Sequence, residues 1–203
     1  KATGADHPMA DEVIASMETD WNRVADAMAG DPPDGSPVWY QKHMTHHMLP
    51  EFGLDWTGDF RHAFLIRAPA RVLASYVAKR EEVALSDIGL VRQVELFDRF
   101  ADKTGAAPPV VDSDELLRDP EGVLRGLCMA LAIPFDPAMF HWPKGRRASD
   151  GVWAPAWYAS VEQSTGFAVQ SSSDLPSLPE HLQRIADAAL PFYGRLAAYR
   201  ISV

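Results

Sequence analysis

The fold is decided by the stretch Phe64-Leu65-Ile66-Arg67-Ala68-Pro69-Ala70-Arg71-Val72-Leu73-Ala74-Ser75-Tyr76. Its apolar beginning, together with Ala63, predicts a short buried strand. Pro69 predicts that a helix begins directly afterwards, because proline is favoured at the first helical position. Arg67 then lies at the carboxyl end of the strand, where open α/β sheets place their ligands. The stretch therefore predicts a strand-to-helix unit with an arginine at the ligand-binding edge.

Arg67 has two interpretations. A helix N-terminus attracts anions through its unpaired N–H groups and its dipole. An arginine beside it can hold a phosphate with two parallel hydrogen bonds, and the Ser75 hydroxyl could add another. Alternatively, Arg67 caps a neighbouring helix or pairs with one of the 28 acidic residues of the chain. The pattern alone leaves both interpretations open.

Apolar segments alternate with helical ones along the rest of the chain. Strands are predicted over Val38–Lys42, Ala63–Ile66 and Pro109–Val111. Helices are predicted over Pro8–Met17, Asp20–Ala29, Pro69–Arg80, Asp87–Lys103, Pro120–Ala132 and Pro179–Tyr199. Strands separated by helices favour an α/β fold in three layers, with a parallel, doubly wound sheet flanked by helices.

Capping residues predict where several helices begin and end. Asp20 and Ser86 are predicted N-caps, and glycines at 30 and 105 are predicted terminators. Pro191 is expected to kink or split the last helix, because proline lacks the N–H that the helix needs.

Composition favours one globular domain over residues 1–203, since the chain is 47% hydrophobic and 23% charged. The segment 168–178, which contains Ser171-Ser172-Ser173-Asp174, is expected to be a mobile loop. Cys128 lies in an apolar run and is interpreted as a core residue.

The formal net charge of −9 argues against nucleic acid or an anionic membrane as a partner. No apolar run approaches the roughly 18 residues of a membrane span. A single cysteine suits a reducing compartment, so the sequence favours a cytoplasmic protein. A homo-oligomer is compatible with this composition.

Three histidines, at positions 43, 46 and 47, lie close together. On a helix they would share one face at i, i+3 and i+4, a spacing that can bind a transition metal and support metal-dependent hydrolysis. No carboxylate-rich pattern accompanies them, so we predict no metal and retain the hydrolase as an alternative. Structural roles for these rings are a further alternative.

Three segments in order resemble the sulfotransferases that use 3′-phosphoadenosine 5′-phosphosulfate, and the match is to bacterial-type members. The Leu65–Tyr76 run resembles the segment that holds the 3′-phosphate of the donor, with an arginine and a serine eight positions apart. The family commonly has Asp or Asn where this chain has Ala68. The second segment, Trp39–Pro50, resembles a strand end with a lysine and a catalytic histidine before Leu-Pro. The third is Lys144-Gly145-Arg146-Arg147 with Asp150-Gly151-Val152-Trp153, which resembles the loop that covers the nucleotide.

This resemblance implies roles for individual residues. The residues implied to bind the donor are Arg67, Ser75, Lys144, Gly145 and Arg146. Lys42 would neutralise charge on the oxygen that leaves sulfur. His47, or else His43, would accept the proton of the acceptor, although the family's tighter Lys-x-His spacing is not kept. The implied acceptor is a small molecule with a hydroxyl or amine, and no metal is required.

The main departure from the family lies before Lys42, where no Gly/Ser/Thr-rich phosphate loop occurs. The resemblance therefore implies a P-loop-type sheet whose N-terminal strand is missing from this chain, and we expect that strand before Lys1. Its absence would leave a gap between the strands at 38–42 and 63–66, whose backbone groups would need another partner. A nucleotide-binding module without catalysis is the alternative function.

Aromatic residues gather beside the Lys144 loop. They are Trp142, Trp153, Trp157, Tyr158 and Phe167. They either form core beneath the loop or stack on adenine and line an acceptor pocket.

Overall fold

The computed structural model describes residues 9–77, 82–168 and 174–202. The chain divides into two compact units. The first comprises residues 1–39, 53–58 and 137–167, and the second comprises residues 40–52, 59–136 and 168–203. Residues 169–173 of the loop predicted at 168–178 lie outside the described residues.

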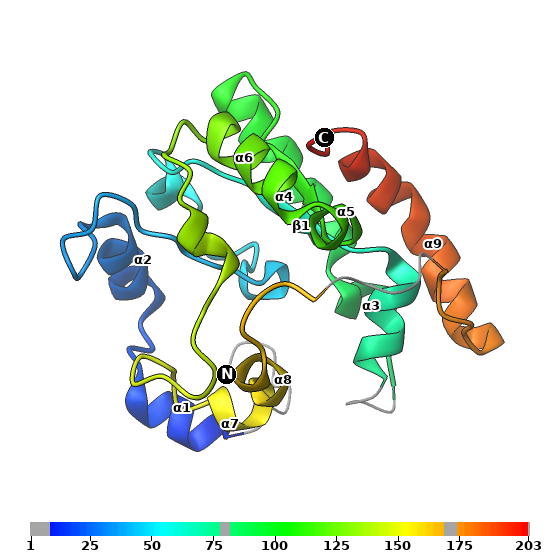
Figure 1. Ribbon diagram of the computed structural model, residues 1–203, viewed down its shortest axis with the longest axis horizontal. Coiled ribbons are helices and arrows are strands. Elements are labelled where there is room, and N and C mark those ends of the chain that lie inside the picture. Colours follow the sequence, from blue (N-terminus) through cyan, green and yellow to red (C-terminus); the bar gives the residue numbers. More distant parts are fainter. Residues whose placement is uncertain (1–8, 78–81, 169–173, 203) are drawn as a thin grey trace. The chain divides into compact units, whose positions relative to one another are not determined.

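The second unit contains the sheet and the longer helices (Figure 1). Its elements are η1 (Thr45–His47), β1 (Phe64–Ile66), α3 (Pro69–Tyr76), η3 (Leu85–Ile88), α4 (Leu90–Thr104), β2 (Val110–Asp112), α5 (Ser113–Arg118), α6 (Pro120–Ala130) and α9 (Glu180–Ala197). The first unit has α1 (Ala10–Ser16), α2 (Trp21–Ala29), η2 (Asp55–Thr57), η4 (Pro137–Phe140), α7 (Ala154–Trp157) and α8 (Ala159–Gln163). The described chain is therefore mostly helical.

Strands β1 and β2 pair in parallel, with Ile66 opposite Asp112. The other edge of β2 also has a partner, because the Ile201 N–H donates to the Val110 carbonyl at 2.9 Å. Two parallel strands joined by helices confirm the general α/β class that the sequence predicts. The sheet is much smaller than the doubly wound sheet that the sequence predicts.

The predicted strand at Val38–Lys42 is wrong. This segment is irregular, and the side chains of Val38 and Tyr40 are 45% and 82% exposed. A strand needs a neighbouring edge for its backbone groups, and β1 pairs with β2 instead. The described residues therefore do not contain the two strands that were expected to flank a gap.

The outer edge of β1 is covered in part by a side chain. Gln93 of α4 donates from Nε2 to the Leu65 carbonyl at 2.8 Å. This bond satisfies a backbone acceptor that the sequence analysis expected to remain open for another strand.

Two of the predicted caps end or begin helices as expected. The Asp20 side chain accepts from the Asn22 N–H at 2.9 Å and begins α2. Gly105, with φ 71°, ends α4 as predicted. Ser86 is not the N-cap of α4, because it lies inside η3 and Gly89 precedes the helix with φ 72°. Pro191 does not split α9, whose turns continue through it with the proline on the exposed side.

The core of the second unit lies between α3, α4, α9 and the strands. Leu73 of α3 is fully buried and clusters with Leu182 and Ala186 of α9, which runs beside α3 in Figure 1. On α4, the Phe97 ring meets Phe64 of β1 edge to face at 5.5 Å between centroids. Cys128 is buried, as predicted for a core residue.

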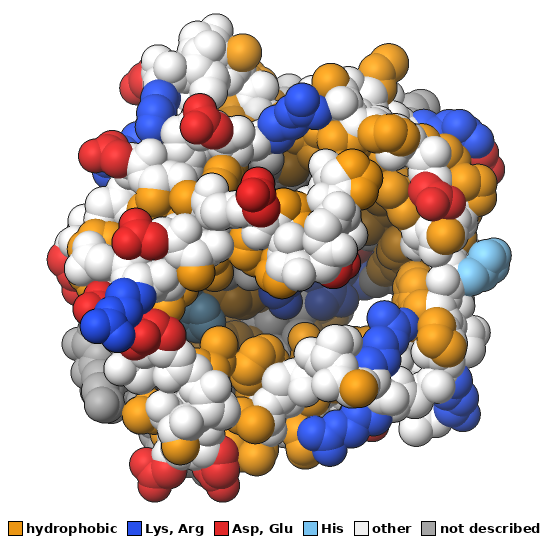
Figure 2. Space-filling view, turned by 90° about the vertical axis from the view of Figure 1, so that its left-hand side faces the viewer, with side chains coloured by type: hydrophobic (Ala, Val, Ile, Leu, Met, Phe, Trp, Pro, Cys, Tyr) orange, Lys and Arg blue, Asp and Glu red, His pale blue; other side chains and the backbone are white. Residues whose placement is uncertain are grey.

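Surface charge is mixed. On the face in Figure 2, acidic and basic side chains are interspersed with exposed apolar ones. Within the described part of the chain, no helix combines the length and apolar character needed to cross a membrane.

Candidate functional site

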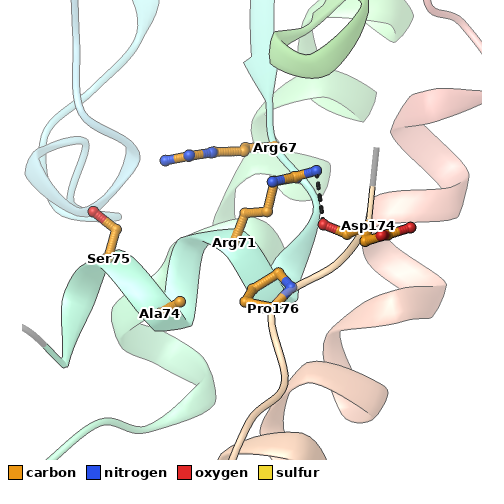
Figure 3. Close-up of a pocket in the computed structure, with 6 residues that line it drawn as sticks. All are labelled: Arg67, Arg71, Ala74, Ser75, Asp174 and Pro176. Carbon is orange, nitrogen blue, oxygen red and sulfur yellow. Dashed lines mark hydrogen bonds between the residues drawn. The ribbon is translucent and has the colours of Figure 1, made fainter. Parts of the chain in front are cut away.

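The candidate site is an open pocket of about 360 Å³ along one side of α3 (Figure 3). It is lined by Arg67, Arg71, Ala74, Ser75, Asp174 and Pro176. The helical repeat explains three of these, because residues at i, i+3 and i+4 share one face. Arg67 joins them from the loop after β1 and, in Figure 3, extends over the helix on the same side as Ser75.

The pocket does not lie at the N-terminus of α3, where the sequence analysis placed the anion. Ala68, Pro69 and Ala70 are buried and do not line it. The Ala68 carbonyl accepts from the N–H groups of Arg71 and Val72 at 2.9 and 3.1 Å, which closes the first turn of the helix. The groups that line this pocket are therefore side chains of α3 and its neighbours rather than the N-terminus of the helix.

Arg67 is half-buried and has no ion pair or hydrogen bond within the described residues. The alternative interpretation, in which it pairs with a carboxylate or caps a helix, has no support in that part of the chain. The Ser75 hydroxyl is exposed at the same pocket. Together they present one positive charge and one hydroxyl to a ligand.

Arg71, in contrast, is paired. Its Nε lies 3.0 Å from Asp114 Oδ2, and the two side chains are only 13% and 24% exposed. Its Nη2 donates to the Asp174 carbonyl at 3.1 Å. Sequence analysis missed Arg71, although it precedes Ser75 by four residues on α3 and therefore lies on the same helix face. It also missed Asp114, whose contact spans 43 positions and has no local signal.

A buried carboxylate supports Asp114 from the end of β2. Asp112 is 4% exposed. Its Oδ1 accepts from the Asp114 N–H at 2.8 Å and caps α5. Its Oδ2 accepts from the Tyr193 hydroxyl of α9. The start of α5 is thus held both by the sheet and by α9.

Tyr193 is expected to make the unfolding free energy of this unit vary with pH in the alkaline range. Burial, followed by the hydrogen bond to Asp112, raises the pKa of Tyr193. A raised pKa means that the native state holds the proton more tightly than the unfolded chain, where tyrosine titrates near about 10. Below that pH the tyrosine contributes its full share of the unfolding free energy. This contribution is lost as the pH rises through the higher pKa of the folded state.

In the Tyr193→Phe variant, we expect the unfolding free energy to fall less steeply with pH above about pH 10 than in the parent, as measured by urea denaturation. An unchanged slope would contradict this assignment.

The predicted catalytic residues lie in the segment 40–52 of the same unit. The Thr45 hydroxyl donates to the Gly89 carbonyl at 3.3 Å, and Arg92 Nε donates to the Met48 carbonyl at 3.0 Å. These bonds attach the segment to the start of α4. Lys42 is exposed, and so is His47 at the end of η1.

His43 is the more buried of the two candidate bases. Its Nε2 lies 3.3 Å from Gln41 Oε1. Because an amide oxygen only accepts, this contact favours the tautomer of His43 that carries the proton on Nε2. Burial lowers the pKa of His43, so the ring is neutral near pH 7, the form that a general base requires.

The metal alternative finds no support among the described side chains. Within them, no group of three His, Cys, Asp or Glu residues lies close enough together to hold a metal ion. The side chain of His46 lies outside that description.

The basic loop predicted to cover the nucleotide belongs to the first unit, whereas Arg67 and Ser75 belong to the second. Lys144, Gly145, Arg146 and Arg147 are all exposed. Gly145 has φ 105°, a conformation that favours glycine, and its N–H donates to the Glu162 carbonyl at 2.8 Å. The loop is therefore anchored to the end of α8.

The neighbouring aromatic residues are partly core. The Trp142 ring meets Phe167 edge to face at 5.5 Å between centroids, and its Nε1 donates to the Ser164 hydroxyl at 2.9 Å. Trp157 is 36% exposed. Trp142 thus has a structural role beside the basic loop.

Comparison with known proteins adds a family. The sequence model described as "Sulfotransferase domain" matches residues 1–200. Two curated Arabidopsis thaliana proteins, the branched-chain-amino-acid aminotransferase-like proteins 1 and 2, are 38% and 33% identical to the chain. Each alignment covers 98% of this chain but only 35% of the relative. The chain thus spans about a third of their length. No solved structure matches.

Proposed function

The chain belongs to the sulfotransferase domain family, and on that premise we propose that it transfers a sulfuryl group from 3′-phosphoadenosine 5′-phosphosulfate to a hydroxyl or amine of a small molecule. In this reaction the acceptor oxygen or nitrogen forms a bond to sulfur. The bond between sulfur and the bridging phosphate oxygen breaks, and adenosine 3′,5′-bisphosphate leaves. The proton of the acceptor passes to a base on the protein. The family also implies a P-loop-type fold.

One observation carries the proposal. Arg67 brings a half-buried guanidinium, with no partner among the described residues, into the pocket that Ser75 shares. A planar guanidinium matches the oxygens of a phosphate and can donate two hydrogen bonds at once. We assign this pocket to the 3′-phosphate of the donor. Lys144, Gly145 and Arg146 are also proposed to bind the donor, as the family resemblance implies.

Sulfuryl transfer resembles phosphoryl transfer in needing alignment and charge stabilisation more than covalent help from the protein. Lys42 is proposed to neutralise the oxygen that leaves sulfur. His43 and His47 are the proposed bases, and the lowered pKa of His43 favours it over the exposed His47.

Calorimetry with two nucleotides tests the 3′-phosphate assignment. Adenosine 3′,5′-bisphosphate is expected to bind at least about tenfold more tightly than adenosine 5′-monophosphate, because a hydrogen bond to a charged group contributes about 1.5–3 kcal/mol. Equal affinities would remove the basis of the proposal.

Transfer itself is tested with a labelled sulfuryl donor and a panel of small hydroxyl and amine acceptors. Labelled product supports the sulfotransferase. Tight bisphosphate binding without transfer to any acceptor would favour the alternative of a nucleotide-binding module.

A further inference from the structure

The pocket contains two arginines in different states. Arg67 has no described partner, whereas Arg71 is ion-paired with Asp114 at 3.0 Å. Two guanidinium groups on one pocket repel each other when both are uncompensated. The Asp114 carboxylate offsets the charge of Arg71, so that the net positive charge of the pair resides on Arg67.

Arg71 also joins three segments that are distant in sequence. It lies on α3, its Nε meets Asp114 at the start of α5, and its Nη2 donates to the Asp174 carbonyl. In Figure 3, Arg71 lies between Arg67 and the segment that carries Asp174 and Pro176, and the Asp174 carboxylate points away from Arg67. Asp174 and Pro176 form a wall of the pocket.

The support behind Asp114 makes this link rigid. Asp112 caps α5 through the Asp114 N–H and is held in turn by the Tyr193 hydroxyl. The bonds therefore run without a break from α9 through Asp112, Asp114 and Arg71 to the wall of the pocket.

We propose that Arg71 is a positioning residue, which ties Asp114 to the Asp174 carbonyl and so fixes the pocket wall while Arg67 meets the anion. This inference rests on the proposed function of the pocket as the 3′-phosphate site. The role requires arginine in particular, because its rigid fork donates in two directions at once whereas lysine offers a single point charge.

The test compares Arg71→Lys with Arg71→Gln, at a temperature where thermal denaturation shows each variant to be folded. Both are expected to bind adenosine 3′,5′-bisphosphate about tenfold more weakly, because a pocket wall that is no longer held in place must be ordered when the ligand binds. The salt dependence of binding should stay unchanged. In the free protein, the backbone ¹⁵N order parameters of Leu175, Ser177 and Leu178 should fall in both variants.

Arg195 provides the matched control. It pairs with Asp98 across α9 and α4 of the same unit, outside the pocket. Arg195→Lys and Arg195→Gln should leave both the nucleotide affinity and the three order parameters unchanged.

Two results would overturn the positioning role. In the first, Arg71→Lys binds the bisphosphate as tightly as the parent protein and only Arg71→Gln binds it more weakly. This would mean that Arg71 acts on the ligand through its positive charge. The other is unchanged order parameters in both variants. If the parent protein does not bind the bisphosphate, the proposed function fails, and the order parameters still decide the positioning role in the same way.

Discussion

Replacing Arg67 with alanine is expected to weaken the binding of adenosine 3′,5′-bisphosphate by about 1.5–3 kcal/mol, the range for a hydrogen bond to a charged group. The guanidinium is half-buried in the pocket and has no competing partner among the described residues. Binding of a phosphate to Arg67 therefore breaks no ion pair among the described residues. Calorimetric titration of the parent and the variant measures the difference.

Two controls separate this effect from general loss of charge. Arg99→Ala removes an exposed arginine from α4 of the same unit and should leave the affinity unchanged. Adenosine 5′-monophosphate, which lacks the 3′-phosphate, should bind the Arg67 variant and the parent equally. Equal affinity of parent and variant for the bisphosphate would refute the assignment.

The unfolding free energy of Arg67→Ala should stay close to that of the parent. Surface substitutions that break no cap, ion pair or core contact usually change stability by less than about 0.5 kcal/mol. A large loss of stability would show that Arg67 has a structural role instead.

Local patterns predicted the part of the fold that carries the pocket. The apolar run before Arg67 and the proline at position 69 are contained in one short stretch, and the structure places β1 and α3 there. Caps such as Asp20 and Gly105 were predicted for the same reason, since a cap acts on backbone groups within a few residues.

The failures involve partners that are distant in sequence. The segment at Val38–Lys42 has the composition of a strand, but strand formation depends on an available edge, which composition does not encode. Arg71 was overlooked because Asp114 and Asp174, its partners, lie 43 and 103 positions away. A family resemblance points to Arg67 and Ser75 but gives no information about a pairing between other residues of the same pocket.

Leu73→Ala is expected to cost about 2–5 kcal/mol of unfolding free energy, the range for removing a large aliphatic side chain from a core. Leu73 is fully buried against Leu182 and Ala186 of α9. Because α9 also contributes Tyr193 to the support of α5, its contact with α3 joins the pocket helix to the rest of the core. Urea denaturation measures the loss.

Leu190→Ala is the matched control for this substitution, because it removes the same atoms from a position of α9 that is 50% exposed. It should cost less than about 0.5–1 kcal/mol of unfolding free energy, since little apolar surface is returned to water.

The Leu73 side chain faces away from the pocket, because it lies two residues from both Arg71 and Ser75 and therefore about 200° around the helix from each. Hence the pocket face is unaltered, and the Leu73 variant should keep its nucleotide affinity at temperatures where it is folded. A cost as small as that of the control would mean that α3 is not held by α9 in solution.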